Sequence, residues 1–244
     1  ERVNLVLNQQ VTELAPGRDG VSITATDANG IEYGYDAEVV LVAMGRVPNA
    51  DTLDLSATGV EVAGDGHVVV DEHQRTSRPN IWALGDVCSR FQLKHVANHE
   101  MRVVQENLLA DIGGQAPVAS SDHRFVPHAV FGHPQIAAVG ATEQELREAG
   151  VKYLTKVQAY GDVAYGWALN DDAHFVKLIS DERAEHLLGA HIIGPQASTL
   201  LQPLVQAMSF GLGIREMARG QYWIHPALTE VIENALLGLV EQAG

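Results

Sequence analysis

A histidine–proline pair near the end of the chain restricts the backbone on both of its sides. His225 precedes Pro226, and the residue before a proline is pushed into an extended conformation. Proline itself is favoured at the first position of a helix. An apolar stripe follows at helical spacing, which is typical of a core or subunit interface: Leu228, Ile232, Ala235 and Leu239. We therefore predict a helix that begins at about Pro226 and presents the His225 ring at its start.

Glu230 lies five positions after His225, in the first turn of the predicted helix. From there its carboxylate can fold back towards the ring. A carboxylate beside a histidine fixes the tautomer of the ring and prepares it for proton transfer. His225 and Glu230 are therefore a candidate catalytic pair, and the alternative is a histidine that only packs at a helix start.

The charge of the chain limits its partners. The net charge is −15, from 31 acidic and 16 basic residues, so we expect neither nucleic acid nor a membrane surface as a partner. No apolar run approaches the ~18 residues that span a bilayer. The single cysteine, Cys88, excludes an internal disulfide framework and predicts a cytoplasmic location. Its own role is most simply that of a small buried residue.

Residues 3–45 are predicted to be β-structure. Val21–Thr26 alternates with period two, and Val3–Leu7 and Ile31–Tyr35 are further candidate strands. The continuous apolar run Glu38–Met44 is typical of a strand buried on both faces. A buried parallel strand needs covering helices, and the chain begins at Glu1 within a strand-like run, so we expect it to be part of a longer protein.

The next segment predicts strands at His67–Asp71 and Ile81–Leu84 and a helix over Val96–Ile112. The predicted apolar stripe of that helix is Ala97, Met101, Val104, Leu108 and Ile112. Gly85-Asp86 follows the second strand. Because ligands of open α/β sheets bind at the carboxyl ends of strands, Asp86 is a candidate acceptor for sugar or polyol hydroxyls. The alternative is that Gly85-Asp86 is merely a turn.

Residues 121–244 predict an α+β unit. Thr142–Glu145 fits a capping box. A helix is expected over Ser198–Phe210, where Pro203 predicts either a kink or a later start. The remaining predicted elements are strands at 126–131, 136–139, 153–159, 175–179 and 187–193, and a short helix at 214–218.

Four motifs now stand in order along the chain: Ala43–Asn49, Ile81–Val87, Phe131–Gly140 and the stretch from His225 to Glu230. Together they resemble the C-terminal half of the pyridine nucleotide–disulfide oxidoreductases, over essentially all 244 residues. The ending Gln221–Leu228 is most similar to the members that reduce the disulfide of mycothiol. A member of the dihydrolipoamide dehydrogenase type is the alternative.

The resemblance implies α/β and α+β architecture, with partial Rossmann-like nucleotide-binding segments followed by an α+β dimerisation domain. Residues 1–45 would be the tail of the NAD(P)-binding domain, 46–120 the end of the FAD-binding domain, and 121–244 the interface domain. The implied NAD(P) contacts are Gly45 and Arg46. The implied FAD contacts are Gly85, Asp86, Leu93, Lys94 and His95. A positive helix start at 93–95 would stabilise negative charge on the reduced flavin.

The resemblance also implies the chemistry. Members pass electrons from NAD(P)H, here with NADPH favoured, through FAD and a redox-active cysteine pair to a small disulfide. Thiol–disulfide exchange needs a proton for the departing sulfur, and a histidine with an unperturbed pKa of ~6.5 can supply it. Residues 121–244 would form a homodimer, in which His225 and Glu230 complete the partner's active site. Glu230 would orient His225 and favour its protonated form.

The chain departs from the family pattern in three features. The cysteine pair and both glycine-rich nucleotide loops are absent, so we expect them in a missing N-terminal half of the same protein. The chain by itself is then expected to be inactive, and whether it binds FAD or NAD(P)H alone stays open. A non-catalytic dimerisation module is the alternative function. No metal site is expected, because the five-residue spacing of His123, His128 and His133 does not place them on one helix face.

Overall fold

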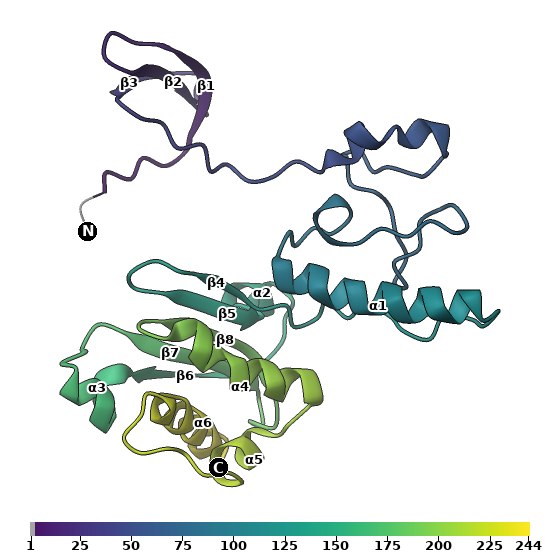
Figure 1. Cartoon of the computed structure of the whole chain (residues 1–244). Helices are drawn as coiled ribbons and strands as arrows, with labels where there is room; N and C mark the ends of the chain where they lie inside the picture. The colour runs from purple at the N-terminus through teal and green to yellow at the C-terminus, as the bar shows by residue number, and fades with distance from the viewer. Residues whose placement is uncertain (1–2) are drawn as a thin grey trace. The chain divides into compact units, whose positions relative to one another are not determined.

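A computed structural model describes residues 3–244, which divide into two compact units after Asn49 (Figure 1). The architecture is mixed α/β, as predicted. No helix within the described residues is both long and apolar enough to cross a membrane.

The first unit is a three-stranded antiparallel meander. β1 (Gln9–Pro16), β2 (Val21–Asp27) and β3 (Glu32–Ala37) follow one another in chain order. The turn between β2 and β3 is held by Asp27, whose carboxylate accepts the N–H of Ile31 at 3.0 Å. The alternating run 21–26 therefore forms the predicted strand at the centre of the meander.

The strands predicted at Val3–Leu7 and Glu38–Met44 are wrong. Both segments are irregular and exposed, and Leu41 is 87% exposed. A strand needs a neighbour that satisfies its backbone N–H and C=O groups. None of the residues from 3 to 244 pairs with either segment, so apolar composition alone does not make them strands.

The second unit begins with a loop-rich segment, residues 50–93. The predicted strands His67–Asp71 and Ile81–Leu84 appear only as isolated bridges, such as Arg75 with Trp82. A small core of Ala50, Val60 and Val68 holds the segment together. Its few apolar residues support single bridges but no continuous ladder, so these two strand predictions are also wrong.

Helix α1 (Lys94–Ile112) confirms the predicted helix but not its buried face. The predicted stripe is largely exposed, with Ile112 75% exposed. The buried residues are Val96, Glu100, Val103, Asn107 and Ala110. The face with Glu100 and Asn107 can be buried because both side chains form hydrogen bonds in the interior. Asn107 alone bonds the backbone of His73, Val118 and Ala119, at 2.8–3.1 Å.

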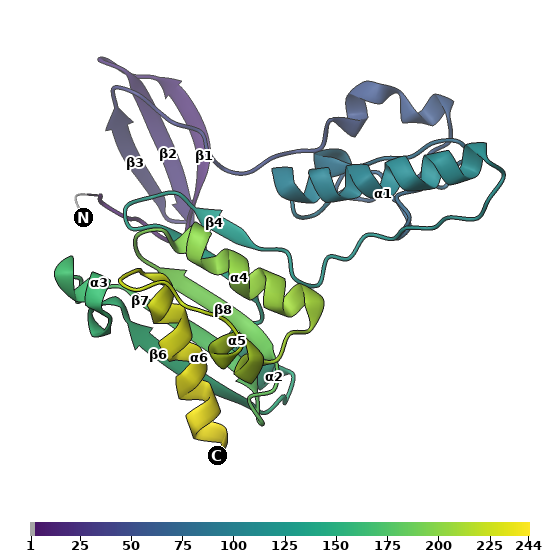
Figure 2. The ribbon, with the colours of Figure 1, turned by 60° about the horizontal axis from the view of Figure 1, so that its bottom comes forward.

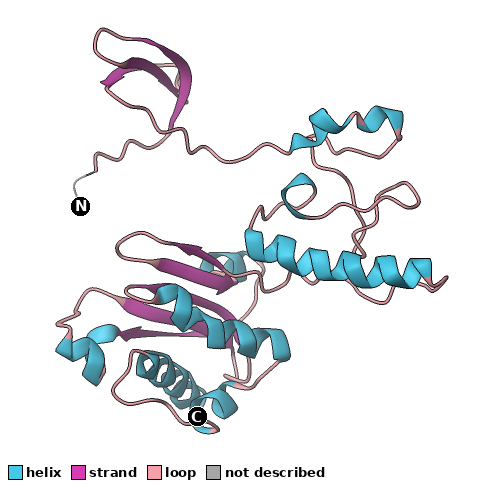
Figure 3. Ribbon diagram, viewed as in Figure 1, coloured by secondary structure: helices cyan, strands magenta, loops and turns pink. Residues whose placement is uncertain are grey.

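The rest of the second unit is built on a five-stranded antiparallel sheet of order β4-β5-β8-β7-β6 (Figures 1 and 3). Its strands are β4 (His128–Val130), β5 (Ile136–Gly140), β6 (Tyr153–Ala159), β7 (Phe175–Asp181) and β8 (Leu187–Ile193). All five strand predictions and the hairpin between β7 and β8 are confirmed.

Two long helices, α4 (Ala197–Phe210) and α6 (Thr229–Ala243), cover one face of this sheet (Figure 2). Their buried faces join the strands in one continuous apolar core. The predicted stripe of α6 is part of that core. α4 begins at Ala197 and continues through Pro203, so the later start is not observed.

Three short helices complete the unit: α2 (Glu143–Glu148), α3 (Ala164–Ala168) and α5 (Ile214–Arg219). The capping box that opens α2 is confirmed. The N–H of Glu145 bonds the hydroxyl of Thr142 at 3.2 Å, and the Glu145 carboxylate accepts the N–H of Thr142 at 2.8 Å.

Candidate active-site residues

The segment that carries His225 is held at both of its ends. Before it, the indole N–H of Trp223 donates to the carbonyl of Ala218 at 3.2 Å. After it, the buried side chain of Leu228 enters the core beneath α6. The helix begins at Thr229 rather than at Pro226, so its predicted start is three residues too early. His225 therefore lies on an anchored loop in front of α6.

His225 and Glu230 contact each other as the spacing predicts. Nδ1 of His225 lies 2.8 Å from Oε1 of Glu230. The other carboxylate oxygen accepts the N–H of Ala227 at 3.1 Å. The imidazole is 67% exposed and the carboxylate 18% exposed. The hydrogen bond from His225, together with the one from the Ala227 backbone, lowers the pKa of Glu230 below its ordinary value.

This geometry leaves one ring nitrogen available. Because Nδ1 faces an ionised carboxylate, it carries the proton in the neutral ring, and Nε2 is then the basic atom. Nε2 belongs to an exposed ring and can exchange a proton with a group outside the chain. The carboxylate would stabilise the positive charge that forms on the ring.

Gly85 and Asp86 lie in a 3₁₀ turn, Gly85–Val87, beside the first turns of α1. Gly85 has a φ of +72°, and a Cβ on it would lie 3.2 Å from the Cβ of Ala97. Its N–H donates to Oε2 of Glu100 at 2.6 Å. The turn therefore needs glycine, and α1 fixes its position.

Leu93, Lys94 and His95 lie at the start of α1 as predicted. Leu93 is the N-cap and makes no side-chain capping bond, and no acidic residue stands in the first turn. Lys94 bonds Asn98 at 3.2 Å, and Nε2 of His95 lies 2.8 Å from the carbonyl of Pro127. α1 has 19 residues, and the partial positive charge at its start is not offset by an acidic side chain. Such a helix start attracts negatively charged groups of a ligand.

The remaining predicted residues are Gly45 and Arg46, and the chain has a single cysteine, Cys88. Gly45 and Arg46 belong to the first unit, where Gly45 has a φ of +101° and an open surrounding. Cys88 is half-buried, and its thiol lies 3.6 Å from the carbonyl of Gly85. Burial and the nearby charge of Glu100 raise the pKa of Cys88 to about 12. Such a thiol is a poor nucleophile at neutral pH.

Sequence reasoning missed Glu100 and its partner His123. The Glu100 side chain is 1% exposed, and its Oε1 lies 3.0 Å from Nε2 of His123. A buried carboxylate with two short hydrogen bonds joins the Gly85 turn to His123, in the segment between α1 and β4. The helical spacing could have revealed that Glu100 is buried, since it lies four residues after Val96 and three before Val103, on the same face of α1.

One group of candidate metal ligands exists in the described chain, at the β7–β8 turn: Asp181, Glu185 and His186. Both oxygens of Asp181 already accept backbone N–H groups, those of Arg183, Glu185 and His186. The Asp181 carboxylate therefore stabilises the turn.

Comparison with known proteins gives the same family along most of the chain. Residues 126–236 match the pyridine nucleotide-disulphide oxidoreductase dimerisation domain, and residues 1–100 match the pyridine nucleotide-disulphide oxidoreductase domain. Mycothione reductase from Mycobacterium tuberculosis is 61% identical over 84% of this chain. Dihydrolipoyl dehydrogenase from Cupriavidus necator is 34% identical over 96% of it.

These relatives are longer than the chain. The match covers 44% of the mycothione reductase and 48% of the dihydrolipoyl dehydrogenase, so the chain spans about half of their length. Among solved structures, the HOCl-induced flavoprotein disulfide reductase RclA from Escherichia coli matches with a TM-score of 0.82 at 25% identity. That match covers 96% of this chain and 51% of RclA.

Proposed function

Because the chain belongs to the pyridine nucleotide–disulfide oxidoreductase family, we propose that it is the C-terminal part of an NAD(P)H-dependent flavoprotein reductase that acts on mycothiol disulfide. The observation that carries this proposal is the 2.8 Å contact between His225 and Glu230. NADPH is the proposed electron donor. The single cysteine means that the redox-active pair must come from outside these 244 residues. The proposed location is the cytoplasm.

His225 is the proposed proton donor and acceptor for the sulfur atoms of the substrate. Thiol–disulfide exchange forms one S–S bond and breaks another, and the departing thiolate takes up a proton. Nε2 of His225 delivers that proton, while Glu230 holds the ring at Nδ1. The exposed ring and its neighbours Tyr222 and Ile224, both exposed, are suited to lie against a partner subunit.

The residues around α1 are the proposed flavin contacts. Asp86 would hold hydroxyl groups of the ribityl or ribose region. The start of α1, with Leu93, Lys94 and His95, would lie beside the isoalloxazine, because its cap and first turn lack a negative side chain. FAD, when bound, supplies two-electron transfer between NAD(P)H and the cysteine pair. Gly45 and Arg46 are the proposed nicotinamide-side contacts.

Residues 121–244 are the proposed dimerisation domain, with 46–120 as the end of the FAD domain and 1–45 as the tail of the NAD(P) domain. An open cleft of about 970 Å³ runs along α4 and β4 in the second unit. Phe131 and Phe210 line it, and each is 76% exposed. Large exposed aromatic side chains on a well-packed core are typical of a homodimer interface.

The test uses the full-length protein. His225→Ala should lower turnover with mycothiol disulfide by about 10²–10⁴-fold, the usual contribution of a general acid–base. Flavin reduction by NADPH, followed by stopped-flow absorbance, should change far less. His133→Ala is the matched control, because His133 is also exposed and also precedes a proline. Equal losses in flavin reduction and turnover would remove the proposed role of His225.

The same enzyme separates two alternatives. A dihydrolipoamide dehydrogenase-type enzyme would turn over dihydrolipoamide with NAD⁺ faster than it reduces mycothiol disulfide. A non-catalytic dimerisation module is favoured by the apolar core of 125–240, which is complete without residues 1–120. The purified 244-residue chain tests this alternative. If it forms dimers in size-exclusion chromatography but shows neither flavin absorbance nor NADPH oxidation, the chain by itself is a dimerisation module.

A further inference from the structure

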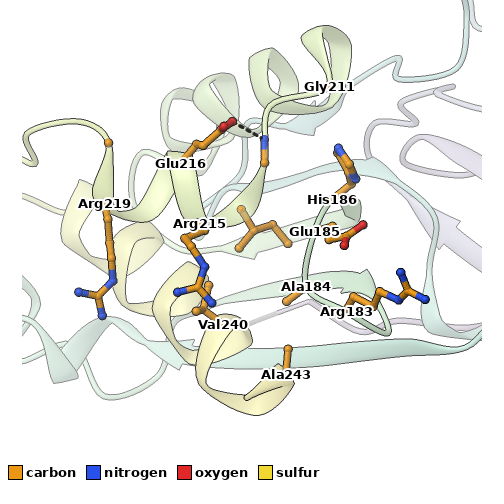
Figure 4. Close-up of a pocket in the computed structure, with 13 residues that line it drawn as sticks. Arg183, Ala184, Glu185, His186, Gly211, Arg215, Glu216, Arg219, Val240 and Ala243 are labelled. Carbon is orange, nitrogen blue, oxygen red and sulfur yellow. Dashed lines mark hydrogen bonds between the residues drawn. The ribbon is translucent and has the colours of Figure 1, made fainter.

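A second cavity, of about 810 Å³, lies in the second unit and includes neither His225 nor Glu230. It is formed by the β7–β8 turn, by α5 and by the end of α6 (Figure 4). Three arginines from two of these elements line it: Arg183 from the turn, and Arg215 and Arg219 from α5. Figure 4 places Arg183 and Arg215 on either side of Ala184.

The three guanidinium groups have no partner in the described part of the chain. None of them forms a side-chain hydrogen bond or an ion pair with another residue from 3 to 244. Arg215 and Arg219 are also four residues apart on α5, and like charges at that spacing destabilise a helix. Three of the 16 basic residues thus line one cavity in a chain of net charge −15.

The two glutamates that line the cavity, Glu185 and Glu216, form no ion pair with the arginines, so the cavity keeps more positive than negative side chains. The Glu216 carboxylate accepts the N–H of Gly213 at 3.2 Å and caps α5. Glu185 is exposed, and its backbone carbonyl receives the N–H of Ile214. The floor between the charged groups is apolar, formed by Ala184, Val240 and Ala243.

We propose that this cavity binds a small organic molecule that carries a di- or triphosphate group. Guanidinium groups bind phosphate oxygens through two parallel hydrogen bonds, and three of them suit a ligand with several negative charges. The volume lies within the range of small-molecule sites, and the apolar floor accommodates the uncharged part of the ligand. The site is separate from the proposed reductase chemistry and does not depend on it.

The test is calorimetric titration of the 244-residue chain with inorganic pyrophosphate at constant ionic strength. The expected result is saturable binding with one site per chain. Arg215→Gln and Arg183→Gln should each weaken binding by about 10- to 100-fold, the value of one charge-assisted hydrogen-bond pair. Arg215→Lys keeps the positive charge but loses the pair of parallel N–H donors, so it should weaken pyrophosphate binding less.

Arg147→Gln is the matched control, because Arg147 is an exposed arginine of α2 that does not line the cavity. It should leave pyrophosphate affinity unchanged. Linear, non-saturable heats for the unmodified chain would overturn the proposal. An equal loss for Arg147→Gln and Arg215→Gln would also overturn it, since that result indicates general attraction of the anion. Unchanged circular dichroism melting curves show that the variants are folded.

Discussion

The pair of His225 and Glu230 combines an exposed ring with a carboxylate that is mostly buried. The Glu230 carboxylate also accepts the backbone N–H of Ala227, so a second contact besides the ring positions it. The exposed ring adds orientation at Nδ1 and leaves Nε2 open. The proposed proton transfer to a neighbouring molecule uses this arrangement, because Nε2 belongs to an exposed ring.

The pH dependence of this pair can be measured through stability. The pKa of Glu230 in the folded chain lies below its ordinary value of 4.5. Its ionised form therefore stabilises the fold above pH 4.5, and this contribution is lost as the pH falls through the lowered pKa. Glu230→Gln should cost about 0.5–1 kcal/mol of unfolding free energy at pH 7, the range of a partly exposed pair.

Urea denaturation at a series of pH values checks this expectation. The difference between the unmodified chain and Glu230→Gln should shrink as the pH falls below 4.5. Glu233→Gln, one turn further along α6, is the control and should show no such trend. A difference that is constant with pH would contradict the assigned hydrogen bond.

Among the elements, α1 shows how buried polar groups decide the orientation of a helix. Its buried face includes the polar residues Glu100 and Asn107, while the apolar side chains of Leu109 and Ile112 are exposed. Burying a carboxylate is costly unless hydrogen bonds satisfy it. Glu100 meets that condition with Gly85 and His123, so the helix is locked against the turn that carries Asp86.

Removal of the hydrogen bonds of Glu100 is expected to lower the free energy of unfolding strongly. Glu100→Ala leaves the Gly85 N–H and His123 without their acceptor and should destabilise the chain by about 3–5 kcal/mol. Glu100→Gln keeps an acceptor and should cost less. Glu106→Ala, an exposed position of the same helix, should stay within about 0.5 kcal/mol. Urea denaturation measures all three, and equal effects of Glu100→Ala and Glu106→Ala would refute the lock.

At the scale of the whole molecule, the proposed homodimer would cover the cleft that Phe131 and Phe210 line and would bring the exposed His225 to the partner subunit. Phe210→Glu places a charge on the exposed end of α4 and should weaken the dimer by at least about tenfold, since desolvating an unpaired charge is costly. Sedimentation equilibrium at several protein concentrations gives the dissociation constant.

Phe91→Glu is unsuitable as a comparison because Phe91 contacts His123. Leu109→Glu is suitable, because Leu109 is exposed on α1 outside the cleft. It should leave the dissociation constant unchanged. Dimers of unaltered stability in Phe210→Glu would place the interface elsewhere.

The sequence by itself determined what depends on near neighbours. The strands of the five-stranded sheet, the capping box of α2, and the spacing that joins His225 to Glu230 were all predictable, because short-range periodicity and side-chain reach decide them. The family was predictable as well, since its motifs are local and keep their order.

Only the tertiary structure decided features that depend on distant partners. Glu38–Met44 was predicted as a strand, but a strand needs a neighbour to complete its hydrogen bonds, and the described chain offers none. The buried face of α1 was mispredicted because the acceptor Glu100 meets donors from residues 85 and 123. The arginines of α5 and the β7–β8 turn line one cavity only because the sheet, α5 and α6 pack together.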